Sequence, residues 1–366
     1  MPVAPASQAR THDARARRPA RDKTGNKAPF GRISIGSACT GLGTCFEACD
    51  ALCAANLGLQ MDHVFACERW ARARQWLGAA RPGLQVLQDV TDLASAPRVD
   101  VFISGFPCQP FSSANRKRKA DDPRREVLPA LVDYIVARRP QLVLLENVPG
   151  VLSQGRSMLA REFGRMEDVG YQVGAKVLDS SLIGRVPQSR RRVYFVARLS
   201  PGGPSPDWRS LWPAPLPCPP LQAILDNNPC DCSCQPSGKG ARAKVQKVAA
   251  SLAAGGLAEG DSRLQDVLVS CLDISGHASQ GRTPCLTSTR GQGGGWWLLA
   301  QRRMFSIAEM QRLQGMDPAK MDLSSMSRAQ AGRMLGNAFT QSVFTRLLAK
   351  ALPFAGLAGQ LADPVG

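Results

Sequence analysis

Short apolar runs and longer amphipathic segments alternate along most of this chain. Each apolar run ends in a glycine, a proline or a polar residue, which is typical of buried strands that lead into loops. We expect strands at residues 33–35, 64–67, 84–87, 99–104, 141–145, 173–178 and 193–196, and helices at residues 44–57, 127–138, 158–169, 305–315 and 340–352. This alternation predicts an α/β fold, in which ligands bind at the carboxyl ends of the strands.

Changes in this pattern predict how the chain is divided. Residues 1–30 form a basic tail without apolar periodicity, which we expect to be disordered because it has nothing to bury. Residues 31–198 carry the first part of the α/β domain, and residues 281–354 return to it. The interval 199–280 is rich in proline and then in Cys, Gly, Ala and Lys, so we expect a smaller lobe there. Residues 355–366 remain as a C-terminal tail.

Charge and cysteine content narrow the class of protein. The formal net charge of +17 over 366 residues favours a polyanionic partner such as nucleic acid. Twelve cysteines without a hydrophobic signal segment favour a reducing interior over a disulfide framework. No apolar run approaches the length that spans a membrane. We therefore expect a soluble, intracellular monomer, located in the nucleus if the source is eukaryotic and in the cytoplasm or nucleoid if it is bacterial.

One loop places a thiol at the end of a predicted strand. Cys108 follows the apolar run 99–104 and lies between Pro107 and Pro110, whose rings restrict the backbone of the loop. A free cysteine is more often an inert, buried apolar side chain. Flanking prolines nevertheless disfavour a strand interior and favour a thiol presented at the edge of the sheet. Cys108 is therefore a candidate nucleophile.

A second group of residues predicts a nucleotide-like ligand. Gly41 and Gly43 lie between the first strand and the first helix, where glycine allows close approach of the backbone and the helix amino terminus favours an anionic group. Glu68 ends the next strand, where a carboxylate can accept hydrogen bonds from both hydroxyls of a ribose. Asp89 follows the third strand and could bind an adenine amino group. Loop capping is the alternative explanation for these acceptors.

Charged residues also stand at the ends of strands predicted later in the chain. Glu146 ends an apolar run, and burial there would raise its pKa and suit it to donate a proton. Gln188, Arg190 and Arg192 alternate, so their side chains share one face of an extended segment. A basic loop after the candidate nucleophile suits phosphate contact, although it also resembles a nuclear-import patch; its residues are Arg116, Lys117, Arg118 and Lys119.

Three of these motifs together resemble the DNA (cytosine-5)-methyltransferase family: Pro107-Cys108-Gln109, Glu146-Asn147-Val148 and the Gln-x-Arg-x-Arg block that begins at Gln188. The family blocks follow their usual order over residues 33–352. The resemblance implies a Rossmann-like, S-adenosylmethionine-dependent methyltransferase sheet with a small target-recognition lobe at residues 199–280. It also implies that the protein transfers a methyl group to C5 of a flipped cytosine in double-stranded DNA.

The resemblance also implies a role for each candidate residue. Cys108 would add to C6 of the cytosine, and Glu146 would hold N3 and the exocyclic amine. Arg190 would hold O2, and Arg192 completes the catalytic set. S-adenosylmethionine would be bound by Cys39, Gly41, Gly43, Glu68, Asp89, Pro107 and Asn337. Nucleic acid would be contacted by Gln109, Ser112, Arg116, Lys117, Arg118, Lys119 and Gln188. Cys39 departs from the family pattern, which usually has a phenylalanine there to pack on the adenine.

Several alternatives remain open at this point. The tRNA-directed branch of the family is built almost alike but usually has a second proline where this chain has Phe106, which favours DNA. Retention of Cys108, Glu146 and Arg190 disfavours an inactive, regulatory homologue. A thiol-redox protein is disfavoured because Cys108 has no nearby cysteine partner. Zinc is not expected, since the candidate ligands lack the usual spacing of a zinc motif; they are Cys218, Cys230, Cys232 and Cys234.

Overall fold

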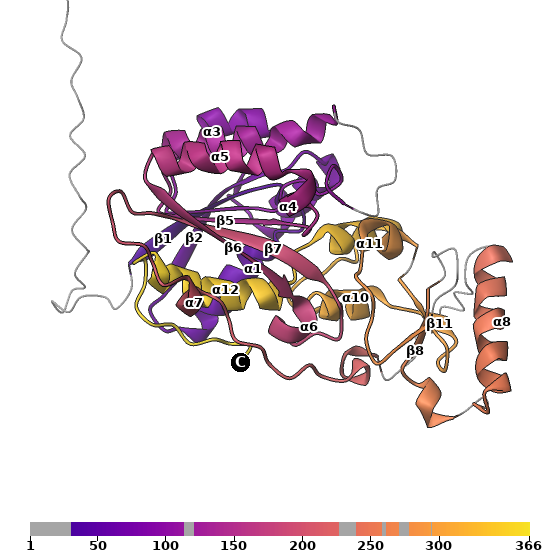
Figure 1. Cartoon of the computed structure of the whole chain (residues 1–366). Helices are drawn as coiled ribbons and strands as arrows, with labels where there is room; N and C mark the ends of the chain where they lie inside the picture. Colours follow the sequence, from indigo (N-terminus) through magenta and orange to yellow (C-terminus); the bar gives the residue numbers. More distant parts are fainter. Residues whose placement is uncertain (1–30, 113–120, 227–238, 258–260, 271–277, 294) are drawn as a thin grey trace, which may run out of the picture.

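A computed structural model describes residues 31–112, 121–226, 239–257, 261–270, 278–293 and 295–366 (Figure 1). Within these residues the main sheet has seven strands in the order β3-β2-β1-β4-β5-β7-β6. They are β1 (Arg32–Ala38), β2 (Gln60–Cys67), β3 (Gln85–Leu87), β4 (Val101–Ser104), β5 (Leu142–Asn147), β6 (Tyr171–Asp179) and β7 (Arg191–Leu199). The expected basic tail and the basic loop residues Arg116, Lys117, Arg118 and Lys119 lie outside the described residues.

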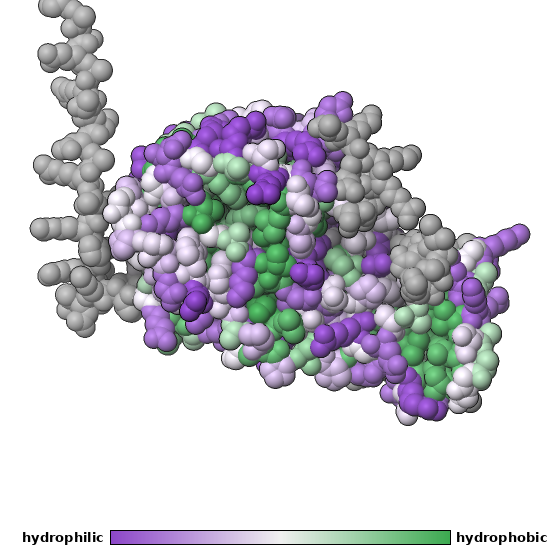
Figure 2. All heavy atoms as spheres, viewed as in Figure 1, coloured by the Kyte–Doolittle hydropathy of each residue, from purple (hydrophilic) through white to green (hydrophobic). Residues whose placement is uncertain are grey.

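Strands β4 and β5 lie in the middle of this sheet. Every residue of both strands is buried, which explains why their sequences are nearly continuous apolar runs rather than alternating ones. Helices α3 (Val127–Arg138) and α5 (Arg156–Asp168) cover one face of the sheet, and α1 (Thr44–Ala55) and α12 (Gln341–Phe354) cover the other. The outer surface over α3 and α5 is hydrophilic (Figure 2). The α/β fold predicted from the sequence is confirmed.

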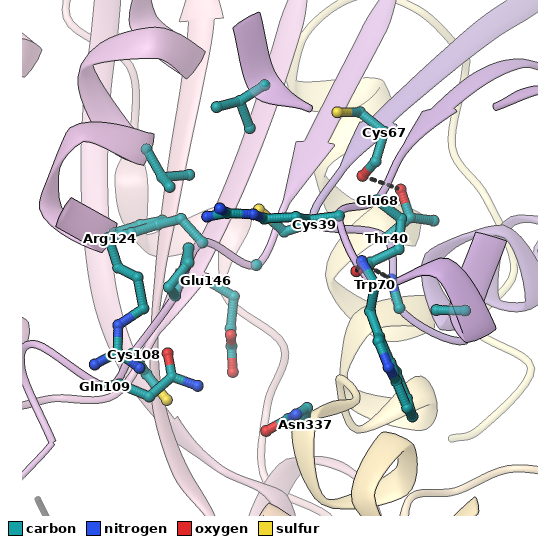
Figure 3. A pocket seen from close by; sticks show the side chains of 18 of the residues that line it. Cys39, Thr40, Cys67, Glu68, Trp70, Cys108, Gln109, Arg124, Glu146 and Asn337 are labelled. Carbon is teal, nitrogen blue, oxygen red and sulfur yellow. Dashed lines mark hydrogen bonds between the residues drawn. The ribbon is translucent and has the colours of Figure 1, made fainter. Parts of the chain in front are cut away.

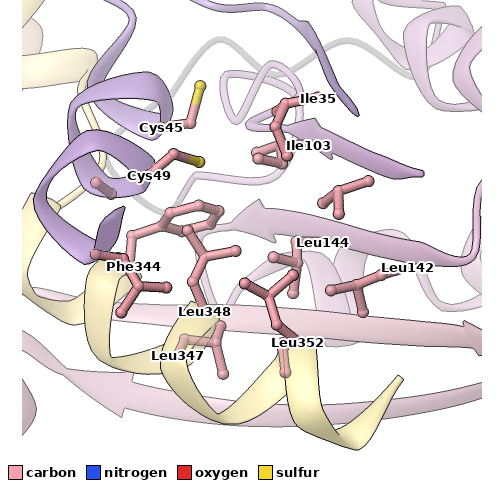
Figure 4. Close-up of a cluster of buried hydrophobic side chains, with 14 of the residues drawn as sticks. Ile35, Cys45, Cys49, Ile103, Leu142, Leu144, Phe344, Leu347, Leu348 and Leu352 are labelled. Carbon is pink, nitrogen blue, oxygen red and sulfur yellow. The ribbon is translucent and has the colours of Figure 1, made fainter. Parts of the chain in front are cut away.

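Apolar side chains from α1, α12 and the sheet meet in one core (Figure 4). Cys45 and Cys49 lie one turn apart on α1, so both face the sheet and are fully buried. Phe344, Leu347 and Leu348 of α12 lie in the same cluster and are at most 1% exposed. Burial of one such side chain stabilises the fold by about 1.5–3 kcal/mol. The last helix of the chain is therefore held firmly against the sheet.

The strand order creates a crevice at the carboxyl end of β1. This strand pairs in parallel with β2 on one side and with β4 on the other. The loops that follow β1 and β4 therefore diverge, and open α/β sheets bind their ligands where this happens. β7 runs antiparallel to β5, so the first residues of β7 lie at the same edge as the carboxyl ends of the parallel strands.

The expected elements occur in the expected order, although some boundaries differ. The first helix ends at Ala55 because Asn56 adopts an extended backbone. The helix expected over residues 305–315 is α10 (Ile307–Leu313), which starts after a capping box formed by Ser306 and Glu309. The sequence did not predict α2 (Ala71–Ala80), since few of its side chains are apolar and buried.

The remaining helices are short or belong to the second half of the chain. They are α4 (Val151–Gln154), α6 (Ser180–Ile183), α7 (Trp208–Leu211), α8 (Lys239–Ala254), α9 (Ser288–Gln292) and α11 (Arg328–Asn337). Short 3-10 turns are η1 (Val90–Ser95), η2 (Pro123–Glu126), η3 (Leu221–Ile224) and η4 (Ser262–Leu264). None of the described helices is long and apolar enough to cross a lipid bilayer.

A smaller sheet lies beside the main one (Figure 1). Its order in the described part of the chain is β11-β10-β8-β9, with β8 (Val267–Val269), β9 (Ala278–Gln280), β10 (Trp297–Leu298) and β11 (Arg303–Met304). These strands are too short to show a regular alternation of apolar and polar residues in the sequence. Helix α8 packs its apolar side, including Val245 and Val248, against Val269 and Trp297. Hydrophobic surface remains visible beside α8 (Figure 2).

Two helices approach each other through glycines. A Cβ atom added to Gly332 of α11 would lie 2.1 Å from the carbonyl oxygen of Gly291 in α9, and one added to Gly291 would lie 1.9 Å from the oxygen of Gly332. A larger residue at either position would therefore force the helices apart. Because α11 ends at Asn337, this contact also fixes the end of α11 at the edge of the main sheet.

Gly332→Ala should lower the free energy of unfolding by about 1–3 kcal/mol, because the added methyl group pushes α9 away from α11. Gly164→Ala is the matched control. Gly164 lies inside α5 with nothing within 4 Å of an added Cβ, and alanine there should raise the free energy of unfolding by about 0.5–1 kcal/mol. Denaturant unfolding measures both values. Equal stabilisation by the two substitutions would contradict the close approach of the helices.

Candidate active site

A cleft of about 850 Å³ lies at the carboxyl edge of the main sheet. Loops that follow β1 to β4 line it, together with Glu146 near the end of β5, the segment of η2 and the first half of α3, the start of β7 and the end of α11. Figure 3 shows side chains from these segments facing the same space. The predicted site residues among the lining are Cys39, Gly41, Glu68, Asp89, Pro107, Cys108, Gln109, Glu146, Arg190, Arg192 and Asn337. The structure thus brings together residues from both ends of the chain.

Cys108 lies on the loop after β4, where the backbone turns tightly. The N–H groups of Phe111 and Ser112 both donate to the carbonyl oxygen of Cys108 at 2.9 Å. The side-chain Nδ2 of Asn147 donates to the carbonyl oxygen of Phe106 at 3.1 Å and ties the loop to β5. These bonds fix the thiol at the end of the strand.

Three charged residues, Arg192, Glu146 and Arg190, influence the ionisation of Cys108. Glu146 ends β5, and its Oε1 pairs with Nε of Arg192 at 3.1 Å. Burial raises the pKa of the Cys108 thiol, and Arg192 is the strongest opposing influence. Burial also raises the pKa of Glu146, again against the pull of Arg192. The position of Arg192 therefore affects how readily both groups lose their protons.

Arg190 occupies a different environment from Arg192. It is 2% exposed, and its Nη1 and Nη2 donate to the carbonyl oxygens of Leu286 at 2.8 Å and Ala338 at 2.6 Å. These bonds connect the start of β7 to two distant segments. Both terminal nitrogens of Arg190 donate to the main chain, although Arg190 also lines the cleft. That Arg190 holds O2 of a base therefore stays a prediction.

Gln188 is corrected as a nucleic-acid contact. It is fully buried, its Nε2 donates to the carbonyl oxygen of Leu313 at 2.7 Å, and its Oε1 accepts from the N–H of Leu286 at 2.6 Å. A side chain with both polar groups bonded in the interior cannot reach a polymer. Gln109 lies beside Cys108 in the cleft (Figure 3), and Ser112 is half-buried on the same loop.

The glycine loop forms the other end of the cleft. Gly41 and Gly43 have φ angles of 56° and 73°, in the left-handed region that glycine adopts without strain. The N–H of Gly41 donates to Oε2 of Glu68 at 2.8 Å, and the N–H of Trp70 donates to Oε1 at 2.8 Å. Glu68 thus braces this loop while its carboxylate lines the cleft (Figure 3). Gly43 itself begins α1 and is not part of the lining.

Asp89 both caps a turn and lines the cleft. Its Oδ1 accepts from the N–H of Thr91 at 3.1 Å, which starts η1. Its Oδ2 lies 4.0 Å from Nε of Arg69. Capping and ligand contact are therefore not exclusive at this position, since a carboxylate oxygen can accept more than one hydrogen bond.

Comparison with known proteins decides the family. Residues 31–211 match the family model of the C-5 cytosine-specific DNA methylase. The chain belongs to the C-5 cytosine-specific DNA methylase family. Type II methyltransferase M.MthTI of Methanothermobacter thermautotrophicus is 44% identical over 104 residues, 27% of this chain and 30% of the relative. Type II methyltransferase M.NlaX of Neisseria lactamica is 34% identical over 140 residues, 37% of this chain and 44% of the relative. The matches thus span less than half the length of these relatives.

Solved structures share the fold of this cytosine-specific DNA methylase family member. The Entamoeba histolytica methyltransferase EhMeth has a TM-score of 0.63 at 15% identity, covering 88% of this chain and 98% of that chain. The S. pombe Dnmt2 methyltransferase has a TM-score of 0.61 at 17% identity, covering 88% and 99%. The expected methyltransferase sheet is confirmed.

The sequence departs from the C-5 methylase family at Cys39. Its φ of 53° is unusual for a residue other than glycine, and burial raises the pKa of its thiol. Trp70, which sequence analysis missed, adds an aromatic side chain to the cleft (Figure 3). The guanidinium of Arg333 lies 4.7 Å from the centre of its ring. The position of Trp70 just after Glu68 in the sequence could have indicated that Trp70 lines the cleft. Arg124 also lines the cleft, but no feature of the sequence indicated it.

The candidate zinc ligands are not assembled in the described part of the chain. Cys218 is half-buried, and its Sγ donates to the carbonyl oxygen of Val186 at 3.5 Å. Cys230, Cys232 and Cys234 lie outside the described residues. Among the residues that the structure describes, no three His, Cys, Asp or Glu side chains are grouped to hold a metal ion.

Proposed function

We propose that this chain transfers a methyl group from S-adenosylmethionine to C5 of cytosine in DNA through a covalent adduct with Cys108. One observation carries the proposal: the thiol of Cys108 and the carboxyl group of Glu146 line the same cleft as the glycine loop. A nucleophile, an acid and a nucleotide-like pocket are the parts that this reaction needs. The family match and the Type II relatives support the same reaction.

The cleft fits S-adenosylmethionine in size and in polarity. Its volume of about 850 Å³ is within the range of small-molecule sites. Thr44 Oγ1 is buried, lies in the cleft and has no hydrogen-bond partner in the described part of the chain, so it is available to a ligand. Glu68 and Asp89 offer acceptors for ribose hydroxyls and an adenine amine, and Trp70 offers an apolar wall. When bound, S-adenosylmethionine supplies an electrophilic methyl group.

The residues at the other end of the cleft activate the base. C5 of cytosine is too weak a nucleophile alone, and addition of the Cys108 thiolate at C6 pushes electron density toward C5. Burial raises the pKa of Glu146, which suits its carboxyl group to donate a proton to N3 as the adduct forms. C5 then takes the methyl group as the bond between that group and the donor's sulfur breaks. Loss of the C5 proton and of the added N3 proton, with departure of the Cys108 thiolate from C6, yields 5-methylcytosine. C6 is covered in a stacked duplex, so the base is flipped out.

DNA is favoured over tRNA as the polymer. Phe106, the residue that differs from the tRNA-directed branch, is 2% exposed and packs against Phe111 with ring centroids 6.3 Å apart. The difference is therefore part of the packing that shapes the loop of the nucleophile. The family description and the Type II relatives also support DNA.

Target recognition is assigned to residues 199–280, because none of the residues of this interval that the structure describes lines the cleft. Readout of base edges needs a surface apart from the chemistry. Helix α8 supports the assignment, since its charged residues are all basic and suit a phosphate backbone; they are Lys239, Arg242, Lys244 and Lys247.

Methyl transfer from labelled S-adenosylmethionine to a duplex DNA pool and to a tRNA pool tests the proposed function. Label should appear at C5 of cytosine in DNA and not in tRNA. Label in tRNA alone would reverse the choice of polymer. Cofactor binding without label in either polymer would identify an inactive homologue instead.

Glu68→Ala should weaken binding of S-adenosylmethionine by at least about tenfold, since a hydrogen bond to a charged acceptor is worth about 1.5–3 kcal/mol. The loss includes the bracing of Gly41 as well as contacts to the ribose. Calorimetric titration with S-adenosylmethionine measures the dissociation constant. Glu47→Gln is the control, because Glu47 of α1 pairs with Arg81 at the end of α2, outside this cleft. An unchanged constant in Glu68→Ala would remove Glu68 from the cofactor site.

A further inference from the structure

Cys285 lies in a segment that is hydrogen-bonded to the residues just before β7. The N–H of Thr283 donates to the carbonyl oxygen of Pro187 at 2.8 Å, and the N–H of Ser189 donates to the carbonyl oxygen of Thr283 at 2.9 Å. These main-chain bonds hold residues 283–286 next to the Gln-x-Arg-x-Arg block. These main-chain bonds therefore fix the position of Cys285 beside the block.

Two guanidinium groups converge on the sulfur of Cys285. Nη1 of Arg190 lies 3.3 Å from Sγ, and Nη2 of Arg192 lies 3.5 Å from it. Burial alone would raise the pKa of this thiol, but the two arginines outweigh burial and lower it. Arg290 of α9 faces the same residue and donates to its carbonyl oxygen. Cys285 thus differs from Cys108, whose pKa is raised.

Each nitrogen of the Arg192 guanidinium has an acceptor. Nε faces Oε1 of Glu146 at 3.1 Å, Nη1 donates to the carbonyl oxygen of Arg191 at 2.7 Å, and Nη2 faces the sulfur of Cys285. A planar group held at three points cannot rotate without breaking a bond. The orientation of Arg192 toward Glu146 therefore depends in part on Cys285.

We infer that Cys285 is a positioning residue: its sulfur, 3.3 Å from Arg190 and 3.5 Å from Arg192, offsets the positive charge of Arg192 and thereby tunes Cys108. The sulfur shares the charge of Arg192 with Glu146 and Cys108. It holds Arg192 in place and limits how strongly Arg192 stabilises the Cys108 thiolate. This inference rests on the proposed function only for its effect on methyl transfer.

The test is the pH dependence of Cys108 alkylation in the full chain. Each protein is treated with iodoacetamide at a series of pH values, and the initial rate at Cys108 is followed by mass spectrometry of its peptide. In Cys285→Ser the hydroxyl still accepts a hydrogen bond but carries no charge. The pH at which the alkylation rate of Cys108 reaches half its maximum should then fall by ~0.5–1 unit. The reason is that less negative charge near Arg192 offsets its positive charge, so Arg192 stabilises the Cys108 thiolate more strongly.

Cys285→Asp is the matched variant, since it restores a negative group at the same position. Its midpoint should lie near that of the wild type, and Cys285→Ala should shift at least as far as Cys285→Ser. An unshifted midpoint in a Cys285→Ser protein with the wild-type unfolding temperature would overturn the inference. A shift of equal size in Cys285→Asp would also overturn it, because the charge would then be irrelevant. If Cys285→Ser does not fold, the comparison of Cys285→Ala with Cys285→Asp decides in the same way.

Methyl transfer provides a second, separate readout. If the proposed function is correct, kcat in Cys285→Ser should fall about tenfold while KM for DNA stays near the wild-type value, since a misoriented Arg192 affects the reacting state. The alkylation assay needs neither DNA nor cofactor. A wild-type chain that transfers no methyl group would therefore refute the proposed function. The alkylation assay would still test the role inferred for Cys285.

Discussion

Duplex DNA that carries 5-fluorocytosine should form a denaturant-resistant adduct with this chain only when S-adenosylmethionine is present. After methylation, C5 would have to lose its fluorine as a cation, which has no chemical path, so Cys108 stays bonded to C6. Cys108→Ser should abolish the adduct, because a serine hydroxyl ionises far less readily than a thiol. Denaturing electrophoresis of the mixture measures the yield. A pool of fluorinated duplexes avoids any assumption about the target sequence.

The controls separate the nucleophile from other thiols and DNA from RNA. Cys218→Ser removes a half-buried cysteine outside the cleft and should leave the adduct intact. Fluorinated tRNA should give no adduct. An adduct that persists in Cys108→Ser would exclude Cys108 as the nucleophile, and an adduct with tRNA but not DNA would move the chain to the tRNA-directed branch.

Glu146→Gln should lower kcat for methyl transfer by about 10²–10³-fold, because an amide can hydrogen-bond to N3 but cannot supply the proton. Glu162→Gln is the control. Glu162 is also buried and paired with arginines, but it lies on α5 outside the cleft, so its substitution should leave kcat unchanged. Steady-state kinetics with labelled cofactor measures both variants. A similar kcat in Glu146→Gln and wild type would rule out Glu146 as the acid.

The same substitution has a consequence for stability that needs no substrate. The folded state binds the Glu146 proton more tightly than the unfolded chain does, because burial raises the pKa. Its contribution to stability is complete below the ordinary carboxyl pKa and is lost as the pH rises through the raised value. Glu146→Gln should remove this part of the pH dependence of the unfolding temperature. An unaltered dependence would mean that Glu146 does not titrate in this way.

Sequence reasoning succeeded where burial is continuous along the chain. Strands β4 and β5 are buried throughout, so their apolar runs were visible, and the loops after them could be located with their side chains. The alternation of Gln188, Arg190 and Arg192 was equally visible, but the partners of the first two were not. Their hydrogen-bond partners are main-chain groups far along the chain, and no local pattern reveals such contacts.

Other parts of the fold left little signal in the sequence. The strands of the small sheet are too short for a period, and α2 buries few apolar side chains. Glu68 was expected to contact a ligand, and nothing in its surroundings indicated that its two oxygens also hold the N–H groups of Gly41 and Trp70. Such bracing depends on how two loops meet, which the spacing of residues along one strand does not determine.

The cleft is built from opposite ends of the polypeptide, which has a consequence for biosynthesis. Residues 39–41 and Thr44 form one wall, and residues 333–334 and 336–339 form part of another. During synthesis on the ribosome, the residues of the first wall are made long before those of the second. Contacts between such distant segments also form slowly, because a large loop must close first. Whatever reaction the cleft performs can therefore begin only after the residues up to Phe339 have been made, and a chain released before residue 333 would have an open, incomplete pocket.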